Sequence, residues 1–367
     1  MTGAAPVISV REIEMQLRTR CESVVRQCLP NAIKDGPYMK VGSIAGEKGS
    51  SLVVPLNGAS RGMWTDYSAA GGPGGTGDMI CMIEQAMFGG DRGQAVAWAK
   101  SYLGIDDLDP GRLATMRAES SARDVAADEE AARETESKKR GARALWMKAA
   151  PLTGTCPASR YLVNRGIDFD RLGGPPGSLR YFPEVFHTDA GVKLPCMLAT
   201  MVTPDGVWVA THRTWLGRDA DGRWVKASDA DVGVPKKKTK MVLGRCGGSF
   251  VPIRKGASGV SMSELRGPET IYVTEGIEDA LTVAMVKPDA RVAAGYSLKN
   301  LGFIAFPETI ATIVIVADRD EDQREVDALE AAIARQQARG HKVQIVMPPV
   351  GVKDVNAWLL LEMERAA

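Results

Sequence analysis

The chain has 367 residues, of which 44% are hydrophobic and 25% are charged, and its formal net charge is +1. This length is enough for two or three folded domains. A net charge so close to zero gives no argument by itself that the protein binds nucleic acid. No run of about 18 apolar residues predicts a membrane span. Residues 1–10 lack the basic and apolar segments of a secretory signal, so we expect a cytoplasmic protein with no membrane partner.

The six cysteines and three histidines are scattered along the chain, and no two cysteines form a Cys-x-x-Cys pair. Tetrahedral zinc sites usually draw ligands from such closely spaced pairs. We therefore predict no zinc, and we expect the cysteines to be small buried hydrophobic residues.

Residues 1–105 predict a small α+β module. Apolar side chains recur at helical spacing over residues 9–28, and short strands are predicted at 51–56 and 63–68. A glycine-rich run then leads into two further helices, the first of which begins near Asp78. Residues 106–142 are rich in Ala, Glu and Arg and poor in large apolar side chains, which predicts a charged, solvated helix or linker.

Residues 143–265 predict a second α+β module, in which two helices precede short strands and a lysine-rich loop at 235–240. Strands and helices then alternate over residues 266–367. Alternation of this kind predicts a parallel sheet with helices on both faces. The expected fold is therefore a multidomain combination of α/β and α+β parts, with a Rossmann-like parallel sheet at the C-terminal end.

Two of the four strands predicted in residues 266–367 end in acidic residues. One ends at Glu275, which Gly276 and Asp279 follow, and another ends about 40 residues later at Asp318 and Asp320. Ligands bind at the carboxyl ends of the strands in such sheets, and clustered carboxylates suit Mg²⁺ or Mn²⁺. The alternative is that each acid caps a helix.

The stretches YVTEGIEDAL and VIVADRDED resemble the Toprim domain, which DnaG-like primases share with topoisomerases, OLD-type nucleases and RecR-type repair proteins. Glu275, Gly276 and Asp279 fit the primase motif Glu-Gly-x-x-Asp, and Asp318 and Asp320 fit the motif Asp-x-Asp. The resemblance implies a metal site formed by the four acids, with Glu275, Asp318 and Asp320 as catalytic residues and Glu275 binding metal or transferring a proton.

Two further features bear on this resemblance. The segment KDVNAW at 353–358 resembles the Lys-Asp-x-Asn segment that often closes the Toprim domain of primases. Glu321 and Asp322 stand where primases often have a glycine shortly after Asp-x-Asp. These two acids either add metal ligands or begin the next helix, where they would offset its dipole.

The region before the Toprim-like segment resembles the N-terminal half of the RNA-polymerase core in phage and plasmid primases. The resemblance rests on RYLVNRGID, LRYFP, PCMLATMV and THRTWL. Residues 205–255 contain 11 Lys and Arg against 5 Asp and Glu, whereas the last 97 residues contain 10 against 15. The basic segment is expected to bind nucleotide or nucleic-acid phosphates, unless its loop is simply solvated; the candidate residues are Arg213, Lys236, Lys237, Lys238 and Lys240.

The stretch MWTDYSAAGGPGGTGDMICMIEQ resembles the last strand and helix of the zinc ribbon that begins primases of this group, although the zinc ligands are absent. The resemblance implies a zinc-free relative of the ribbon. Arg61, Trp64 and Tyr67 would then contact single-stranded DNA. The alternative is that Trp64 and Tyr67 pack onto the module's own core.

Together the resemblances imply a primase of phage or plasmid replication, that is, a nucleotidyltransferase that makes short RNA primers on a single-stranded DNA template. Its substrates would be ribonucleoside triphosphates, its cofactor Mg²⁺ or Mn²⁺, and its possible protein partner a separately encoded replicative helicase. The alternatives are a Toprim nuclease and a non-catalytic adaptor that binds nucleic acid.

Overall fold

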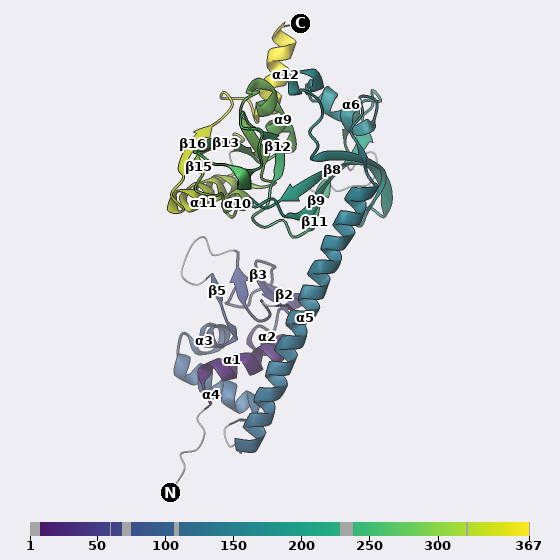
Figure 1. Cartoon of the computed structure of the whole chain (residues 1–367). Helices are drawn as coiled ribbons and strands as arrows, with labels where there is room; N and C mark the ends of the chain where they lie inside the picture. Colours follow the sequence, from purple (N-terminus) through teal and green to yellow (C-terminus); the bar gives the residue numbers. More distant parts are fainter. Residues whose placement is uncertain are drawn as a thin grey trace. The chain divides into compact units, whose positions relative to one another are not determined.

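The structure is a computed structural model, and it describes residues 8–58, 60–67, 75–105, 110–227, 238–320 and 322–366. The chain divides into two compact units, residues 1–134 and 135–367 (Figure 1). The helix α5 (Pro110–Lys148) contains the point of division, so the charged segment predicted as a helix or linker is helical from Pro110 onward. None of the described helices is long and apolar enough to cross a membrane.

The first unit combines four helices with an antiparallel sheet of five short strands, which follow one another in the order β1-β2-β3-β4-β5. The helices before α5 are α1 (Val10–Thr19), α2 (Cys21–Cys28), α3 (Met79–Phe88) and α4 (Arg92–Leu103). The strands are β1 (Ile33–Asp35), β2 (Tyr38–Val41), β3 (Leu52–Pro55), β4 (Trp64–Asp66) and β5 (Thr76–Gly77).

Local capping explains where the helices of the first unit begin. The Ser9 hydroxyl accepts from the amide of Glu12, whose carboxylate accepts in return from the Ser9 amide, so a complete capping box starts α1. The predicted cap Asp78 starts α3, because its carboxylate accepts from the amide of Cys81 at 2.7 Å. The helices bury one common core, in which Ile13 and Trp64 are almost fully enclosed.

The second unit opens with an antiparallel sheet of order β10-β9-β8-β7-β6, on which β11 also pairs with β9. Its long strands are β7 (Leu179–His187), β8 (Val192–Val202) and β9 (Trp208–Arg218). The shorter elements are β6 (Ala150–Pro151), α6 (Pro157–Asn164), α7 (Phe169–Leu172), β10 (Trp224–Lys226) and β11 (Lys240–Gly244).

A second sheet completes the unit, with the order β12-β14-β13-β15-β16. The strands are β12 (Val251–Lys255), β13 (Glu269–Thr274), β14 (Arg291–Ala294), β15 (Ile310–Val316) and β16 (Lys342–Val346). The helical segments are a 3₁₀ turn (Met262–Glu264), α9 (Ile277–Val286), α10 (Leu298–Leu301), α11 (Gln323–Ala338) and α12 (Val355–Ala366).

This sheet is mixed, whereas the alternation of strands and helices predicted a parallel one. Four strands are parallel as predicted, but β12 joins the edge of the sheet antiparallel to β14. The sequence did not predict β12 as a strand of this sheet, because the segment is short and contains Pro252. Sheets tolerate proline mainly in edge strands, which is where β12 lies. The strand comes from the segment predicted to belong to the preceding module.

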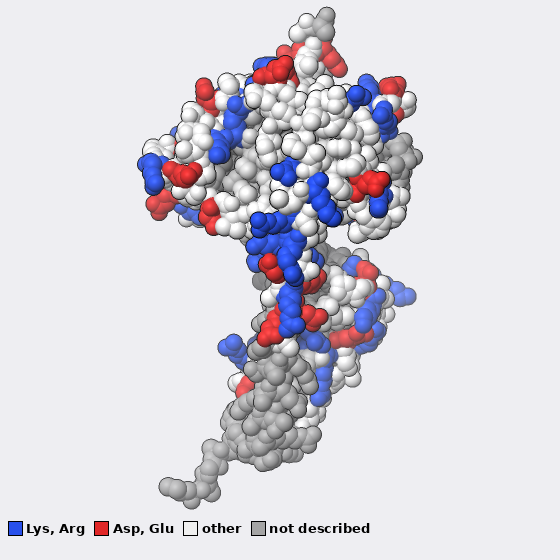
Figure 2. Space-filling view, turned by 45° about the vertical axis from the view of Figure 1, so that its right-hand side comes forward, with Lys and Arg blue, Asp and Glu red and all other residues white. Residues whose placement is uncertain are grey.

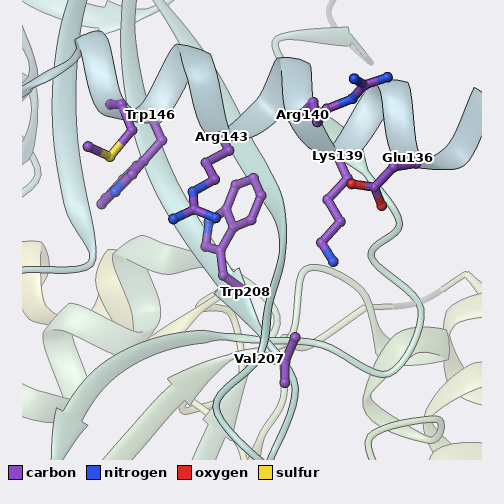
Figure 3. Close-up of a pocket in the computed structure, with 8 residues that line it drawn as sticks. Glu136, Lys139, Arg140, Arg143, Trp146, Val207 and Trp208 are labelled. Carbon is purple, nitrogen blue, oxygen red and sulfur yellow. The ribbon is translucent and has the colours of Figure 1, made fainter.

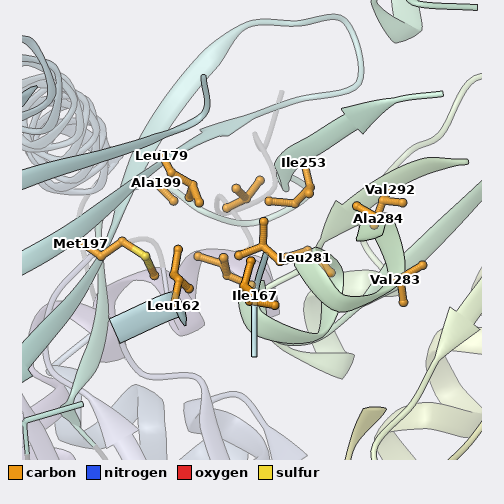
Figure 4. Packing of buried hydrophobic residues seen from close by; sticks show 14 of the residues in the cluster. Leu162, Ile167, Leu179, Met197, Ala199, Ile253, Leu281, Val283, Ala284 and Val292 are labelled. Carbon is orange, nitrogen blue, oxygen red and sulfur yellow. The ribbon is translucent and has the colours of Figure 1, made fainter. Parts of the chain in front are cut away.

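The two sheets of the second unit share one hydrophobic core, which Figure 4 shows from close by. Leu162 of α6 and Met197 of β8 contribute from the antiparallel side, and Ile253 of β12 contributes from the mixed sheet. Leu281 of α9 lies among them, and nine of the ten residues of α9 are buried. This burial holds the first turn of α9, with its two acidic residues, in a fixed position.

Candidate functional site

Acidic residues from three separate segments meet at the carboxyl end of the parallel strands. The strands β13 and β15 pair so that Thr274 lies opposite Val316, which brings Glu275 and Asp318 to the same edge of the sheet. The amide of Arg319 donates to the carbonyl of Lys353 at 2.7 Å, which draws the segment containing Asp354 to this edge as well. We call Glu275, Asp279, Asp318 and Asp354 the acidic rim.

Asp279 is the most enclosed member of the acidic rim. Its Oδ1 accepts a hydrogen bond from the amide of Asn356 at 3.1 Å. Burial, together with the charges of Asp354, Asp318 and Glu278, raises the pKa of Asp279 to about 7. The carboxyl is therefore partly protonated at neutral pH as long as no cation is bound.

The other members of the acidic rim show the same effect of crowding. Burial and the neighbouring Asp354 raise the pKa of Asp318 above its ordinary value. Burial also raises the pKa of Glu275, although Lys240 opposes the shift. Asp354 was not among the predicted ligands, but the KDVNAW segment that contains it was the signal for it.

The donor set of the acidic rim suits a hard divalent cation, because all its donors are carboxylate oxygens, whose mutual repulsion Lys240 and Lys353 offset only in part. In the part of the chain that the structure describes, however, no three acidic, histidine or cysteine side chains converge on a point where they could hold a metal ion. Binding of Mg²⁺ or Mn²⁺ would therefore require the carboxylates to turn toward a common point.

The two acids that follow the rim strand behave differently. Asp320 is exposed, and it affects the pKa of Asp318 through its charge. Asp322 is the N-cap of α11, where its carboxylate accepts from the amide of Arg324 at 3.0 Å. Of the two alternatives given for Asp322, the structure therefore supports the one in which it begins the next helix. Glu321 lies outside the described residues.

Glu278, the neighbour of Asp279 on α9, joins the two sheets through a buried ion pair. It lies 3.0 Å from Nζ of Lys226 on β10 and accepts from the hydroxyl of Tyr161 on α6. Burial alone would raise its pKa, but Lys226, Tyr161 and Lys240 together hold the pKa well below its ordinary value. The sequence did not distinguish Glu278 as a candidate site residue, because acidic residues are common in the first turn of any helix.

A narrow cleft lies between the acidic rim and the antiparallel sheet. It is lined by Glu275, Gly276 and Glu278 on the acidic side and by His212 and Lys240 on the other, with Tyr296 between them. Lys240 ends the lysine-rich loop predicted to bind phosphates; it begins β11, opposite Thr214 of β9, and lines this cleft. Opposite charges thus line one cleft within one unit.

Two uncharged groups shape the same cleft. Burial and the charge of Lys240 lower the pKa of His212 to about 3, so its imidazole is neutral. Its ring meets the ring of Tyr296 edge-on, with 5.5 Å between centroids. Tyr296 has a φ of 73°, the one left-handed value outside glycine in the described part of the chain, and its amide donates to the carbonyl of Glu275. Strained backbone of this kind gathers at binding sites.

The remaining basic candidates have different surroundings. Lys236 and Lys237 lie outside the described residues. Lys238 forms an ion pair with Asp189 at 2.5 Å. The guanidinium of Arg213 lies over the ring of Trp215, and its buried Nε has no hydrogen-bond partner among the described residues.

The candidates of the first unit divide into buried and exposed residues. Trp64 is only 1% exposed and its Nε1 donates to the carbonyl of Asp78, so the expectation that it stacks on DNA is wrong, because the alternation of β4 turns the indole into the core. Arg61 donates to the carbonyl of Thr19 and so links this segment to α1. Tyr67 is 75% exposed and stays a candidate for contact with single-stranded DNA.

Comparisons with known families agree with the geometry of the second unit. The Toprim domain family matches residues 270–363, a range that contains the whole acidic rim. A family described as a domain of unknown function (DUF7146) matches residues 136–253, which include the antiparallel sheet. No curated protein sequence matches the chain.

Three solved structures are similar to the chain at low identity. The Aquifex aeolicus primase, with its zinc-binding and RNA polymerase domains, is 15% identical, with a TM-score of 0.37 over 96% of this chain and 83% of that one. The primase fragment of the bacteriophage T7 primase–helicase protein is 17% identical, with a TM-score of 0.34 over 59% and 77%. The E. coli primase catalytic core is 15% identical, with a TM-score of 0.33 over 56% and 69%.

The family match and the sheet lead to the same identification. The matched range contains the strands β13 to β16 and the acids at their carboxyl ends, in the order that the sequence motifs predicted. The chain is therefore a Toprim-domain protein, with its Toprim domain at residues 270–363.

Proposed function

We propose that this protein is a metal-dependent nucleotidyltransferase that makes short RNA primers on single-stranded DNA. The observation that carries the proposal is the cleft that Lys240, at the start of β11, lines together with Glu275 and Glu278 of the Toprim domain. The carboxylates would hold a cation and the ammonium group would contact a phosphate oxygen. The cleft has a volume of only about 10 Å³, so it must open to admit a nucleoside triphosphate.

Each group in the cleft has a separate task in the proposed reaction. Asp279, Asp318 and Asp354 would hold the cation, which when bound neutralises charge on the reacting phosphate. Lys240 would hold phosphate oxygens of the incoming ribonucleoside triphosphate. Glu275, whose pKa burial raises above its ordinary value, would accept the proton of the primer 3′-hydroxyl as its oxygen attacks the α-phosphorus and pyrophosphate leaves.

The setting of this activity follows from the sequence resemblances. Residues 143–260 resemble the primase cores of phage and plasmid proteins, which supports a role in replication alongside a replicative helicase. Tyr67, together with the basic residues Arg213, Lys238 and Lys240, would contact the template or the nucleotide.

A priming assay tests the proposal. The protein is incubated with single-stranded DNA of mixed sequence, labelled ribonucleotides and Mg²⁺ or Mn²⁺, and the products are sized on a denaturing gel. We expect short labelled RNA that disappears in the Asp318→Asn, Asp354→Asn double variant. It should persist in Glu330→Gln, a control on the exposed face of α11. Primer synthesis that survives the double variant would overturn the assignment.

A parallel lane with labelled DNA distinguishes the rival activities. Metal-dependent shortening of the DNA without primer synthesis would assign the chain to the Toprim nucleases. A non-catalytic adaptor is the second candidate, because no three described side chains converge at metal-binding distance. Nucleic-acid binding without synthesis or cleavage would support that adaptor role.

A further inference from the structure

A groove on the second unit lies between the C-terminal part of α5 and the start of β9. Its helix side is lined by Glu136, Lys139, Arg140, Arg143, Trp146 and Met147, and its strand side by Val207 and Trp208. Each of these helix residues has another of them three or four positions away, so their Cα atoms lie along one side of the helix. The groove contains none of the residues assigned to the acidic rim or its cleft.

The helix that forms one wall is fixed to the sheet, so the groove is a lasting feature of the unit. Ala142 is fully buried, and its carbonyl accepts from the hydroxyl of Thr211 on β9 at 3.1 Å. The guanidinium of Arg180 on β7 lies 4.6 Å from the ring of Trp146 and donates to the Trp146 carbonyl. These contacts turn the neighbouring side of α5 toward the groove.

The groove has a net positive charge, because cations outnumber acids three to one among its lining residues. Lys139, Arg140 and Arg143 take part in none of the salt bridges found between described side chains. Glu136 is the one acid among the lining residues. Figure 2 shows Lys and Arg side chains gathered at the C-terminal part of α5. The surface therefore favours a ligand with several negative charges.

Aromatic rings lie among these cations. Figure 3 shows Arg143 extending from the helix toward Trp208, with Trp146 one turn further along α5. Both indoles are only partly buried, and Nε1 of Trp208 has no hydrogen-bond partner among the described residues. Cations for a phosphate backbone, alternating with flat rings for unpaired bases, are the combination that binds single-stranded nucleic acid without strong sequence preference.

We propose that this groove binds single-stranded nucleic acid, with Lys139, Arg140 and Arg143 contacting phosphates and Trp208 stacking on a base. A phosphate strand fits better than an acidic peptide, because a partly exposed indole would gain little from carboxylate side chains but stacks well on a base. The groove is separate from the acidic rim, so it binds whether or not the chain synthesises primers.

Equilibrium binding without metal or nucleotide tests the proposal separately from any catalysis. The full chain is titrated, in the presence of EDTA, into a labelled oligothymidylate of about 20 nucleotides, longer than the span expected of one such groove, and fluorescence anisotropy is read at several salt concentrations. The test variant is Lys139→Gln, Arg140→Gln, Arg143→Gln. The control removes equal charge from exposed cations of the Toprim side, as Arg266→Gln, Lys299→Gln, Lys342→Gln.

The expected result is a loss of affinity of about tenfold or more for the test variant, and a salt slope reduced by about 2 because three phosphate contacts are lost. The control should keep the wild-type affinity and slope. A further variant, Trp208→Leu, should bind more weakly with an unchanged slope. Because the three cations lie on the surface of α5, the triple variant should fold even if Trp208→Leu does not. Circular dichroism spectra of both variants, compared with that of the wild type, check the fold.

Two results would overturn the proposal. One is equal affinity and equal salt slope in the test variant and the control. The other is tight binding of a labelled polyglutamate, lost in the test variant, together with no binding of the oligothymidylate, which would assign the groove to an acidic protein partner instead.

Discussion

Asp279 on α9 and Asn356 on α12 are joined by a hydrogen bond of 3.1 Å from the Asn356 amide to the Asp279 carboxylate, across 77 positions of sequence. The Asn356 side chain adds bonds to the hydroxyl of Thr282 and the carbonyl of Arg165. This junction therefore links the last helix to the acidic rim and to the preceding α/β region. The carboxylate at its centre has a pKa raised to about 7, which makes it a sensitive probe of the rim.

The substitution Asp279→Asn should stabilise the metal-free protein at alkaline pH. The folded-state pKa of about 7 lies above the ordinary value of 3.8, so wild-type stability falls as pH rises between these values. The gain from Asn, which keeps an oxygen to accept from Asn356, should be absent near pH 4, grow until about pH 7 and then stay constant. Thermal unfolding at a series of pH values measures it, and a gain that does not depend on pH would contradict the assigned shift.

Mg²⁺ or Mn²⁺ should raise the melting temperature of the wild-type chain, because a ligand that binds only the folded state stabilises it. The rise should be larger at pH 8 than at pH 5.5, since protons compete with the cation for Asp279 and Asp318. Differential scanning fluorimetry with added MgCl₂ or MnCl₂ measures the effect. Glu330→Gln should respond like the wild type, whereas Asp318→Asn, Asp354→Asn should not respond.

Removal of Lys226 should destabilise the second unit by about 3 kcal/mol, because Glu278 would remain buried without its cation. The Glu278 side chain is only 5% exposed, so after the loss of Lys226 its charge would depend on the Tyr161 hydroxyl and on the charge of Lys240. Chemical denaturation of Lys226→Ala measures the change in the free energy of unfolding. Lys193→Ala is the matched control, because its pair with Glu184 is exposed and 3.8 Å long, and it should have little effect. Similar losses in both variants would mean that the buried pair has no special role.

Glu14→Ala should destabilise the first unit by about 2 kcal/mol, and Glu14→Gln should cost less. The Glu14 carboxylate accepts from the amides of Met79 and Ile80 at the start of α3, so truncation leaves buried amides without partners. Glutamine keeps one acceptor oxygen. Chemical denaturation of the full chain, monitored by circular dichroism, measures both variants. Glu22→Gln, at an exposed ion pair of α2, provides the comparison and should leave the transition unchanged.

The sequence by itself predicted the elements whose hydrophobic pattern is strong and local. The strands and helices of the Toprim domain and the start of α3 near Asp78 belong to this group. The acids at the strand ends were predicted because their spacing in the chain matches a known motif. Parallel strands place their carboxyl ends at one edge, so order along the chain translated directly into proximity in space.

Contacts between distant segments were decided only by the tertiary structure. Glu278 meets Lys226 across 52 positions and Tyr161 across 117, and no local pattern of charge or hydropathy encodes such a meeting. Trp64 looked like an exposed aromatic residue, but a three-residue strand does not reveal which of its faces the helices will cover. The groove beside α5 forms because contacts of Ala142 and Trp146 fix this highly charged helix to the antiparallel sheet. Which side of the helix faces the sheet depends on packing against strands that lie dozens of residues further along the chain.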